Sequence, residues 1–204
     1  MPEGPEVWIL SKAINTHFNE QKTISYGKHL FILDVNENWS FGLTGKVQLN
    51  DKDELIKVNT GWIYGDQDKY NNLELEKGKL GFDFMTADEA IVRETVDKWN
   101  KSKQKLAGLM LDQTKIAGIG VEWGSEILFK AGLRPDIKYC DQNLSTLADS
   151  ILYIRNHIKN IYEKELKEPE LLINNWFENL YQVREMHVYK KGSKIDVLGR
   201  SWWV

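Results

Sequence analysis

The first six residues, MPEGPE, bring together groups that can do covalent chemistry. Once Met1 is removed, Pro2 presents a secondary amine. Because α-amino groups titrate near pH ~8, a sizeable fraction of this amine is nucleophilic at neutral pH. Such an amine can form a Schiff base with a carbonyl carbon, for example C1′ of an opened deoxyribose, and Glu3 can move protons there. The alternative is that these prolines and Gly4 only mark a turn or a helix cap.

This hexamer resembles the start of the formamidopyrimidine-DNA glycosylase/endonuclease VIII family of base-excision repair enzymes. Gly4 is more like the endonuclease VIII branch, because the branch that acts on oxidised guanine usually has leucine there. The resemblance implies that Pro2 attacks the sugar and that Glu3 protonates the ring oxygen. It gives Glu6 the task of supporting Glu3 or holding the helix start.

Composition is that of a soluble globular protein, with 204 residues, 42% of them hydrophobic and 28% charged. The single cysteine, Cys140, excludes an intramolecular disulfide and a four-cysteine zinc site. The histidines are widely spaced, so we expect no metal, and we expect no cofactor because the amine carries the chemistry. No apolar run approaches the ~20 residues of a membrane span. The acidic, proline-containing start is wrong for a signal peptide, so we expect an intracellular, soluble protein. We also expect a monomer.

Charge is distributed unevenly along the chain, whose net charge is −3. Residues 1–87 hold 9 Lys/Arg against 13 Asp/Glu, and residues 88–204 hold 18 against 17. Within the second part, 98–115 and 184–204 are locally basic. These two patches can meet phosphates, although scattered lysines also occur on any solvated face.

The N-terminal part is rich in predicted strands. Apolar residues at helical spacing predict a first helix over 5–19. Short apolar runs between Gly, Asn and Asp turns predict strands of a sandwich or barrel. They lie at 28–35, 39–43, 46–49, 55–58, 62–64, 73–75 and 80–84, with a hairpin turn at 76–79.

From Thr86 the pattern becomes helical, beginning with an N-cap and acidic first-turn residues. Amphipathic patterns predict helices over 88–100, 103–113, 121–131, 143–163 and about 170–181. Two strands are predicted in 186–204, around a turn at Lys191-Gly192-Ser193. We therefore predict one domain over 1–87 and a second over 88–204.

The segment 105–135 carries the strongest internal signal. A helix ends near Gln113, a Gly-Ile-Gly connection follows, and a second helix is closed by glycine and proline. A helix N-terminus after such a connection suits a phosphate. The whole segment resembles the helix–two-turns–helix of the same repair family. This resemblance implies that Lys115, Gly118 and Gly120 bind DNA.

Two further matches lie in the N-terminal part. Tyr26-Gly27-Lys28 resembles the family's Gly-Lys strand, which implies that Lys28 contacts the DNA backbone near the lesion or assists elimination. Residues 40–45 resemble the loop that pushes a side chain into the duplex. Leu43 would then fill the space left by a flipped base. The alternatives are an exposed strand lysine and a core leucine.

The C-terminal residues resemble the family's hairpin finger, with Tyr189 and Arg200 at its DNA-contacting positions. In most members four cysteines hold zinc there. This chain lacks them and so resembles the zincless finger of some endonuclease VIII-like proteins. Trp202 and Trp203 either pack the hairpin in place of the metal or form a plain aromatic terminus.

Together the matches imply an α+β fold. A helix and β-sandwich form the catalytic domain (1–87), and a helix–two-turns–helix domain (88–204) ends in a zincless hairpin at about 184–204. The implied activity is that of a DNA glycosylase and AP lyase acting on damaged DNA. Gly4 and a reduced segment at 166–172 favour oxidised pyrimidines as substrates.

Several departures keep a second function open. The chain is short for the family. Where the family usually has an Asp-Arg-Arg-Phe-Gly run, this chain has Phe84-Met85-Thr86. Val121 stands where the family has a phosphate-binding asparagine. These changes favour a catalytically degenerate DNA-binding or scaffold module, whereas the intact Pro2 and Glu3 favour the enzyme.

Overall fold

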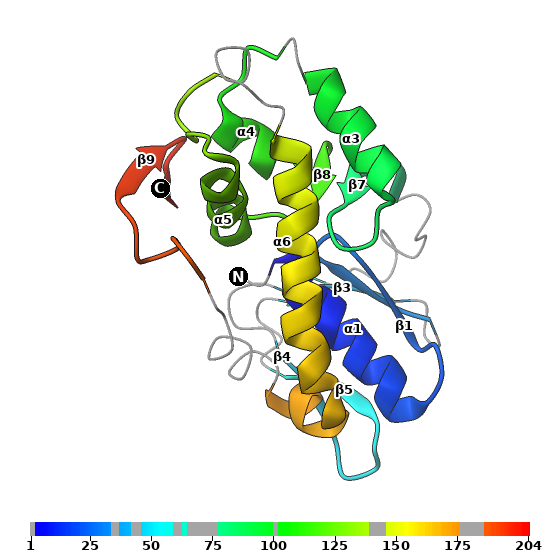
Figure 1. Ribbon diagram of the computed structural model, residues 1–204. Helices are drawn as coiled ribbons and strands as arrows, with labels where there is room; N and C mark the ends of the chain where they lie inside the picture. Colours follow the sequence, from blue (N-terminus) through cyan, green and yellow to red (C-terminus); the bar gives the residue numbers. More distant parts are fainter. Residues whose placement is uncertain are drawn as a thin grey trace. The chain divides into compact units, whose positions relative to one another are not determined.

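A computed structural model describes residues 3–33, 37–41, 46–58, 63–64, 77–99, 102–138, 146–175 and 186–204 (Figure 1). The chain forms two compact units. The first comprises Met1–Lys79 and Lys159–Arg184, and the second comprises Leu80–Ile158 and Glu185–Val204. This division differs from the predicted boundary between residues 87 and 88, because residues after Lys159 pack with the N-terminal part. The mixture of helices and strands confirms the α+β class.

Helix α1 (Gly4–Phe18) forms the core of the first unit and confirms the predicted first helix. Ile9, Leu10 and Ile14 are fully buried, which stabilises the fold by about 1.5–3 kcal/mol for each side chain. At its C-terminal end, the Asn15 amide joins the first strand. Asn15 Nδ2 donates to Thr23 O at 3.0 Å, and Thr23 N–H donates to Asn15 Oδ1 at 2.9 Å.

The first unit contains a four-stranded sheet in the order β1-β2-β3-β6, with α1 beside β1 (Figure 1). Its strands are β1 (Thr23–Tyr26), β2 (His29–Ile32), β3 (Glu37–Phe41) and β6 (Ile63–Tyr64). Strands β4 (Lys46–Leu49) and β5 (Leu55–Val58) have the predicted bounds, and they form a separate antiparallel hairpin. The predicted strand at 73–75 lies outside the described residues.

Two later segments complete the first unit. A 3₁₀ helix, η4 (Glu163–Lys167), leads to a helical segment at 169–175. Asn174 ties that segment to the hairpin, because Leu49 N–H donates to its Oδ1 at 2.8 Å. The predicted hairpin turn at 76–79 is wrong over 77–79, which are helical.

The second unit is mainly helical. It contains α3 (Glu89–Lys98), α4 (Leu106–Leu111), α5 (Val121–Ala131) and α6 (Leu147–Tyr162) up to Ile158. The predicted helix over 121–131 is therefore confirmed. Two short strands, β7 (Phe82–Asp83) and β8 (Ile116–Ala117), pair in parallel at its centre.

A buried arginine links α6 to the start of α3. Arg155 is 9% exposed, and its guanidinium donates to the carbonyl of Ala87. Burial lowers the pKa of Arg155, against the opposing effect of Glu89 and neighbouring carboxylates. Arginine nevertheless stays charged over the whole physiological range.

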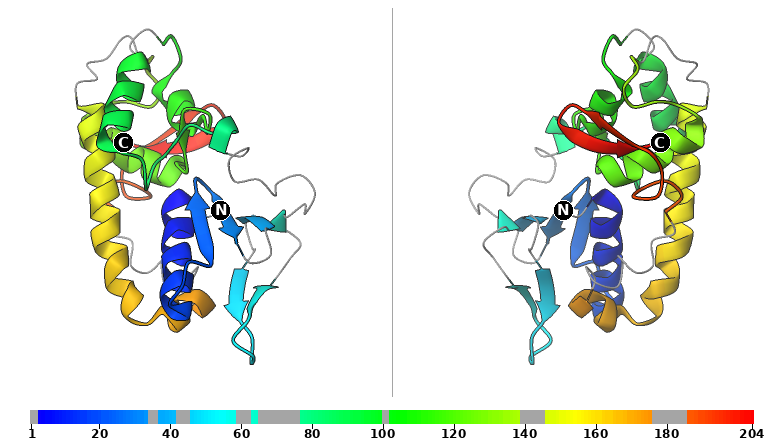
Figure 2. Two further views of the ribbon diagram at one scale, coloured as in Figure 1. Left: turned by 90° about the vertical axis from the view of Figure 1, so that its right-hand side faces the viewer. Right: turned by 90° about the vertical axis from the view of Figure 1, so that its left-hand side faces the viewer.

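The C-terminal hairpin consists of β9 (Lys194–Val197) and β10 (Arg200–Trp203), beside α5 (Figure 2, red). The chain does turn at 189–191, but this turn lies before β9 and does not join the two strands, as the turn predicted at 191–193 would. The chain turns at Leu198 and Gly199, where φ is +54° and +70°. Two residues with positive φ between directly paired strands are typical of a two-residue hairpin turn, because the backbone twist of such a turn matches that of the flanking strands. In the described part of the chain, no helix is long and apolar enough to cross a bilayer.

Gly81 cannot be replaced by alanine without moving the main chain. A Cβ at this position would lie 2.1 Å from the carbonyl carbon of Lys115. We expect Gly81→Ala to lower the free energy of unfolding by about 2 kcal/mol or more, because backbone atoms must shift. Gly78→Ala is the matched control, since no atom lies within 4 Å of its added Cβ. Equal urea unfolding midpoints for the two variants would contradict this.

Candidate nucleic-acid interface and amine site

The start of α1 places two predicted catalytic carboxylates together. Glu3 is the N-cap residue, and its N–H donates to Glu6 Oε2 at 2.7 Å, within a reciprocal capping box. Glu3 is 5% exposed and Glu6 is 2% exposed. Tyr162 reaches the same group, with its hydroxyl donating to Glu6 Oε1 at 3.4 Å. The backbone that follows position 2 is therefore held in one conformation.

Of the other site residues predicted in the N-terminal part, the structure describes only Lys28. Lys28 is half-buried and lies in the two-residue turn after β1, rather than in a strand as predicted. The strands force this position, because Tyr26 pairs directly with His29. Gly27 takes a φ of +57° at the first turn position. Pro2 and Leu43 lie outside the described residues.

The connection between α4 and α5 is organised by Asp112. Its Oδ1 accepts hydrogen bonds from Thr114 N–H at 3.0 Å and from Thr114 Oγ1 at 2.6 Å. Its Oδ2 accepts from Lys115 Nζ at 2.7 Å. Burial acts to raise the pKa of Asp112, but the hydrogen bonds from Lys115 and Thr114 hold it below the usual value. Lys115 therefore has a fixed position in this loop.

Gln113 holds the other side of this connection. Its Nε2 donates to Ile119 O at 2.9 Å and to Leu111 O at 3.2 Å, and its Oε1 accepts from Gly118 N–H at 2.9 Å. Gly118 needs this support in a conformation with φ of +96°, which glycine adopts without strain. The side chain of Gln113 thus fixes the backbone at the two positions before Gly120, the N-cap of α5.

The predicted site residues of the C-terminal segment lie on either side of β9. Tyr189 N–H donates to Glu126 Oε1 at 2.8 Å, and its ring meets Trp203 edge-on with centroids 6.0 Å apart. Arg200 is exposed at the first position of β10. The structure thus places Tyr189 and Arg200 in one unit with Lys115, Gly118 and Gly120.

Sequence reasoning did not assign functional or supporting roles to Gln113 and Glu126. A signal for Glu126 exists, because it lies on the apolar face of a predicted helix, between Trp123 and Ile127. Glutamate is rarely buried unless it is paired. Gln113 gives no comparable signal, since its hydrogen bonds go to backbone groups whose positions only the fold defines.

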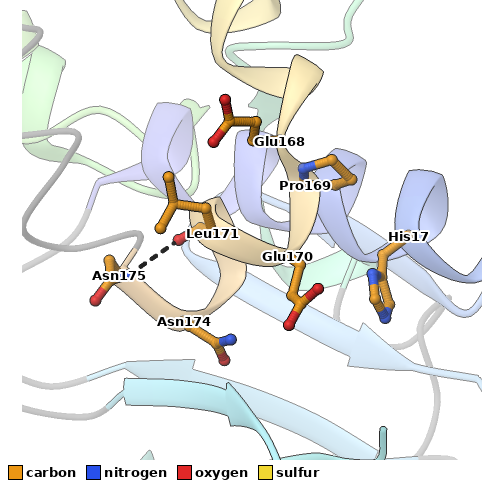
Figure 3. A pocket seen from close by; sticks show the side chains of 7 residues that line it. All are labelled: His17, Glu168, Pro169, Glu170, Leu171, Asn174 and Asn175. Carbon is orange, nitrogen blue, oxygen red and sulfur yellow. Dashed lines mark hydrogen bonds between the residues drawn. The ribbon is translucent and has the colours of Figure 1, made fainter.

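A cavity of about 490 Å³ in the first unit lies apart from these residues (Figure 3). It is lined by His17, Glu168, Pro169, Glu170, Leu171, Asn174 and Asn175. Two carboxylates at its rim make it unsuited to a phosphate. Over the described ranges, no group of three or more His, Cys, Asp or Glu side chains is placed to hold a metal ion.

Gln113→Glu tests the loop geometry with an isosteric change. A carboxylate oxygen would face the carbonyls of Leu111 and Ile119 in place of a donor. We expect the free energy of unfolding to fall by about 1–3 kcal/mol in urea denaturation. Gln104→Glu, at an exposed position, is the control and should leave stability unchanged. The loop role is rejected if both variants unfold at the same urea concentration.

Comparisons over the whole chain find similarity to known proteins through the fold. No protein-family model and no curated protein sequence matches the chain. Among solved structures, MutM (Fpg) from Thermus thermophilus is similar with a TM-score of 0.66 and 17% identity, over 99% of this chain and 96% of that one.

Two structures of the Lactococcus lactis protein are also similar. Wild-type Fpg (MutM) in complex with DNA containing an oxidised pyrimidine gives a TM-score of 0.65 and 17% identity, covering 99% of this chain and 97% of that one. Formamido-pyrimidine DNA glycosylase bound non-covalently to DNA with an AP site gives 0.59 and 21%, covering 90% and 78%. The chain has the fold of the formamidopyrimidine-DNA glycosylases (Fpg/MutM).

Proposed function

We propose that this protein is a base-excision-repair DNA glycosylase with AP lyase activity. The observation that carries the proposal is the capped start of α1, where Glu3 and Glu6 are buried together directly after Pro2. The Fpg-like fold supports it, because three of the similar structures hold DNA with an oxidised pyrimidine, a THF residue or an abasic site. Substrate binding and catalysis by this chain follow by analogy.

The proposed reaction starts at the amine of Pro2. Its nitrogen bonds to C1′, the glycosidic bond breaks as the damaged base leaves with the electron pair, and the proton that the amine gives up neutralises the departing base. Glu3 gives a proton to the ring oxygen, which opens the sugar and leaves an iminium ion between Pro2 and C1′. Loss of a proton from C2′ then expels the 3′ phosphate, and a second elimination expels the 5′ phosphate. The reaction needs no cofactor.

Glu6 and Lys28 assist this centre in different ways. Because Glu6 accepts the N–H of Glu3, it keeps the main chain at the amine in place. Lys28, in the turn after β1, is assigned to the DNA backbone near the lesion or to the elimination steps. We assign catalysis to residues 1–87 and most DNA contacts to residues 88–204.

The proposed DNA contacts of the second unit come from the connection between α4 and α5 and from the C-terminal hairpin with the segment before it. Lys115 and the backbone at Gly118 and Gly120 meet phosphates as a helix–two-turns–helix. Arg200, exposed beside the hairpin turn, and Tyr189 meet phosphates next to the lesion. In the N-terminal part, Leu43 fills the space left by the flipped base.

The substrate is assigned as an oxidised pyrimidine, and the protein as a monomer with a zincless hairpin finger. Gly4 supports the pyrimidine preference by its likeness to the endonuclease VIII branch. Trp202, which is fully buried, supports a finger held by packing.

The first test is reductive trapping on an oligonucleotide with an abasic site. With borohydride present, we expect a covalent protein–DNA adduct, because the reductant converts the Schiff base to a stable amine. Pro2→Gly should lose most of the adduct while still binding DNA. Intact mass must first show that Met1 has been removed, since a retained Met1 blocks the amine.

If Pro2→Gly gives as much adduct as wild type, the secondary amine of Pro2 is not required, and the Schiff base forms either at the new N-terminal amine or at a lysine. No adduct from a folded protein that lacks Met1 would instead support a DNA-binding or scaffold module. The departures at Val121 and at Phe84-Met85-Thr86 favour that outcome.

Glu3→Gln separates the two activities. We expect base excision to fall by roughly a hundredfold or more, because the ring oxygen loses its proton donor, while cleavage at preformed abasic sites partly remains. Gel assays with a damaged base and with an abasic site measure the two rates. Glu6→Gln is the control, and its losses should be equal for both substrates because it weakens only the helix start. An equal loss of both rates in Glu3→Gln would reject the proposed role.

A further inference from the structure

Glu126 is a buried carboxylate that the proposed chemistry does not use. It lies on α5 and is 2% exposed. Its Oε2 accepts from His187 N–H at 2.8 Å and lies 3.2 Å from His187 Nδ1. Its Oε1 accepts from the N–H groups of Val188 and Tyr189, both at 2.8 Å. One side chain thus holds three successive backbone N–H groups.

Such an arrangement is specific to a carboxylate. An ionised carboxylate offers two oxygens that only accept, and both can accept more than one hydrogen bond. Burying it without partners would cost several kcal/mol. Three backbone N–H groups offset that cost only while residues 187–189 keep this conformation. The carboxylate and the backbone segment therefore fix each other.

The held segment leads directly into the C-terminal hairpin. Gly192 N–H donates to Val188 O at 2.8 Å, and Ser193 pairs with Val204 through hydrogen bonds of 3.0 Å in both directions. The path from Glu126 to the hairpin is therefore a continuous set of hydrogen bonds. Arg200 lies at the first position of β10, directly after the hairpin turn at Leu198 and Gly199. This is the end of the hairpin opposite to the Ser193–Val204 pair.

The other strand of the hairpin docks on the same helix. Trp202 is fully buried, and a Cβ added at Gly124 would lie 3.0 Å from its ring. Trp203 N–H donates to Ser125 Oγ at 3.2 Å. Three consecutive positions of α5 thus contact the C-terminal segment, two through hydrogen bonds and one through packing.

We propose that Glu126 is a positioning residue that sets the C-terminal hairpin on α5, so that Arg200 is presented to a DNA phosphate. This inference rests on the proposed function, because it assigns the hairpin to DNA. Glu126 acts through the backbone of residues 187–189 and does not touch the substrate.

A double-mutant cycle tests the inference. Affinity for a duplex with a stable abasic-site analogue is measured for wild type, Glu126→Gln, Arg200→Ala and the double variant. We expect each single change to weaken binding roughly tenfold, since a charge-assisted contact is lost or misplaced. In the Glu126→Gln background, Arg200→Ala should cost less than about twofold, because the arginine no longer meets its phosphate.

Glu94→Gln is the matched control. It removes the same charge from an exposed side chain of the same unit. Neutralising a carboxylate alone should leave DNA affinity unchanged or slightly tighter, so only a positioning role explains weaker binding of Glu126→Gln. Additive losses in the cycle, or unchanged affinity in Glu126→Gln, would overturn the inference.

A second readout works without DNA. In ¹⁵N–¹H spectra, the amide signals of Val188, Tyr189 and Arg200 should all move in Glu126→Gln. If the Arg200 signal stays while the other two move, the hairpin is placed without Glu126 and the inference is wrong. Should wild type fail to bind DNA, the proposed function fails, and this spectrum still decides whether Glu126 places the hairpin.

Ser125→Ala covers the case in which Glu126→Gln does not fold. It removes only the acceptor of Trp203 N–H and loosens the hairpin at its other strand. We expect Ser125→Ala to weaken DNA binding in the wild-type background but not in the Arg200→Ala background. Independence of the two changes would count against positioning of Arg200 by α5.

Discussion

The second unit depends on a place where main chain meets main chain with no room for a side chain between them. Gly81 lies against Lys115, and its N–H donates to Gln113 O at 2.8 Å. This approach lets β7 and β8 pair, and the pairing fixes where the chain leaves α4 and enters α5. This contact places the backbone of Lys115, while Asp112 and Gln113 hold the rest of the connection. A side chain at residue 81 would separate the strands before it affected any ligand.

Both units use buried carboxylates in the same physical way. Glu6 accepts a backbone N–H at the start of α1, and Glu126 accepts three such groups near the C-terminus. In each case a charge removed from water is stabilised by backbone donors, so the geometry of the main chain is specified along with it. The start of α1 and the segment that leads into the C-terminal hairpin are both held by this arrangement.

Much of the fold could be predicted from the sequence, because α1 and α5 have long apolar patterns and clear ends. The hairpin turn could not. Gly192 is the stronger local turn signal, yet the chain turns at Leu198 and Gly199, since burial of Trp202 and pairing of Ser193 with Val204 set the register. Glu3 was predicted because it directly follows Pro2, and Glu6 was predicted from the resemblance of the first six residues to the repair family. The role of Glu126 was not, because its partners are backbone groups that are distant in sequence.

The first unit is built from two stretches of the chain that are far apart in sequence, and this affects the order in which the units fold. Residues 159–184 belong to that unit, and Tyr162 reaches Glu6 across 156 positions of sequence. During synthesis at about 5–20 residues per second, helix α1 therefore leaves the ribosome long before its last neighbours exist. The second unit, most of which is encoded in between, can condense first. Until residues 159–184 have been made, the apolar surface of α1 is incompletely covered, which exposes this helix to aggregation while the chain is being made.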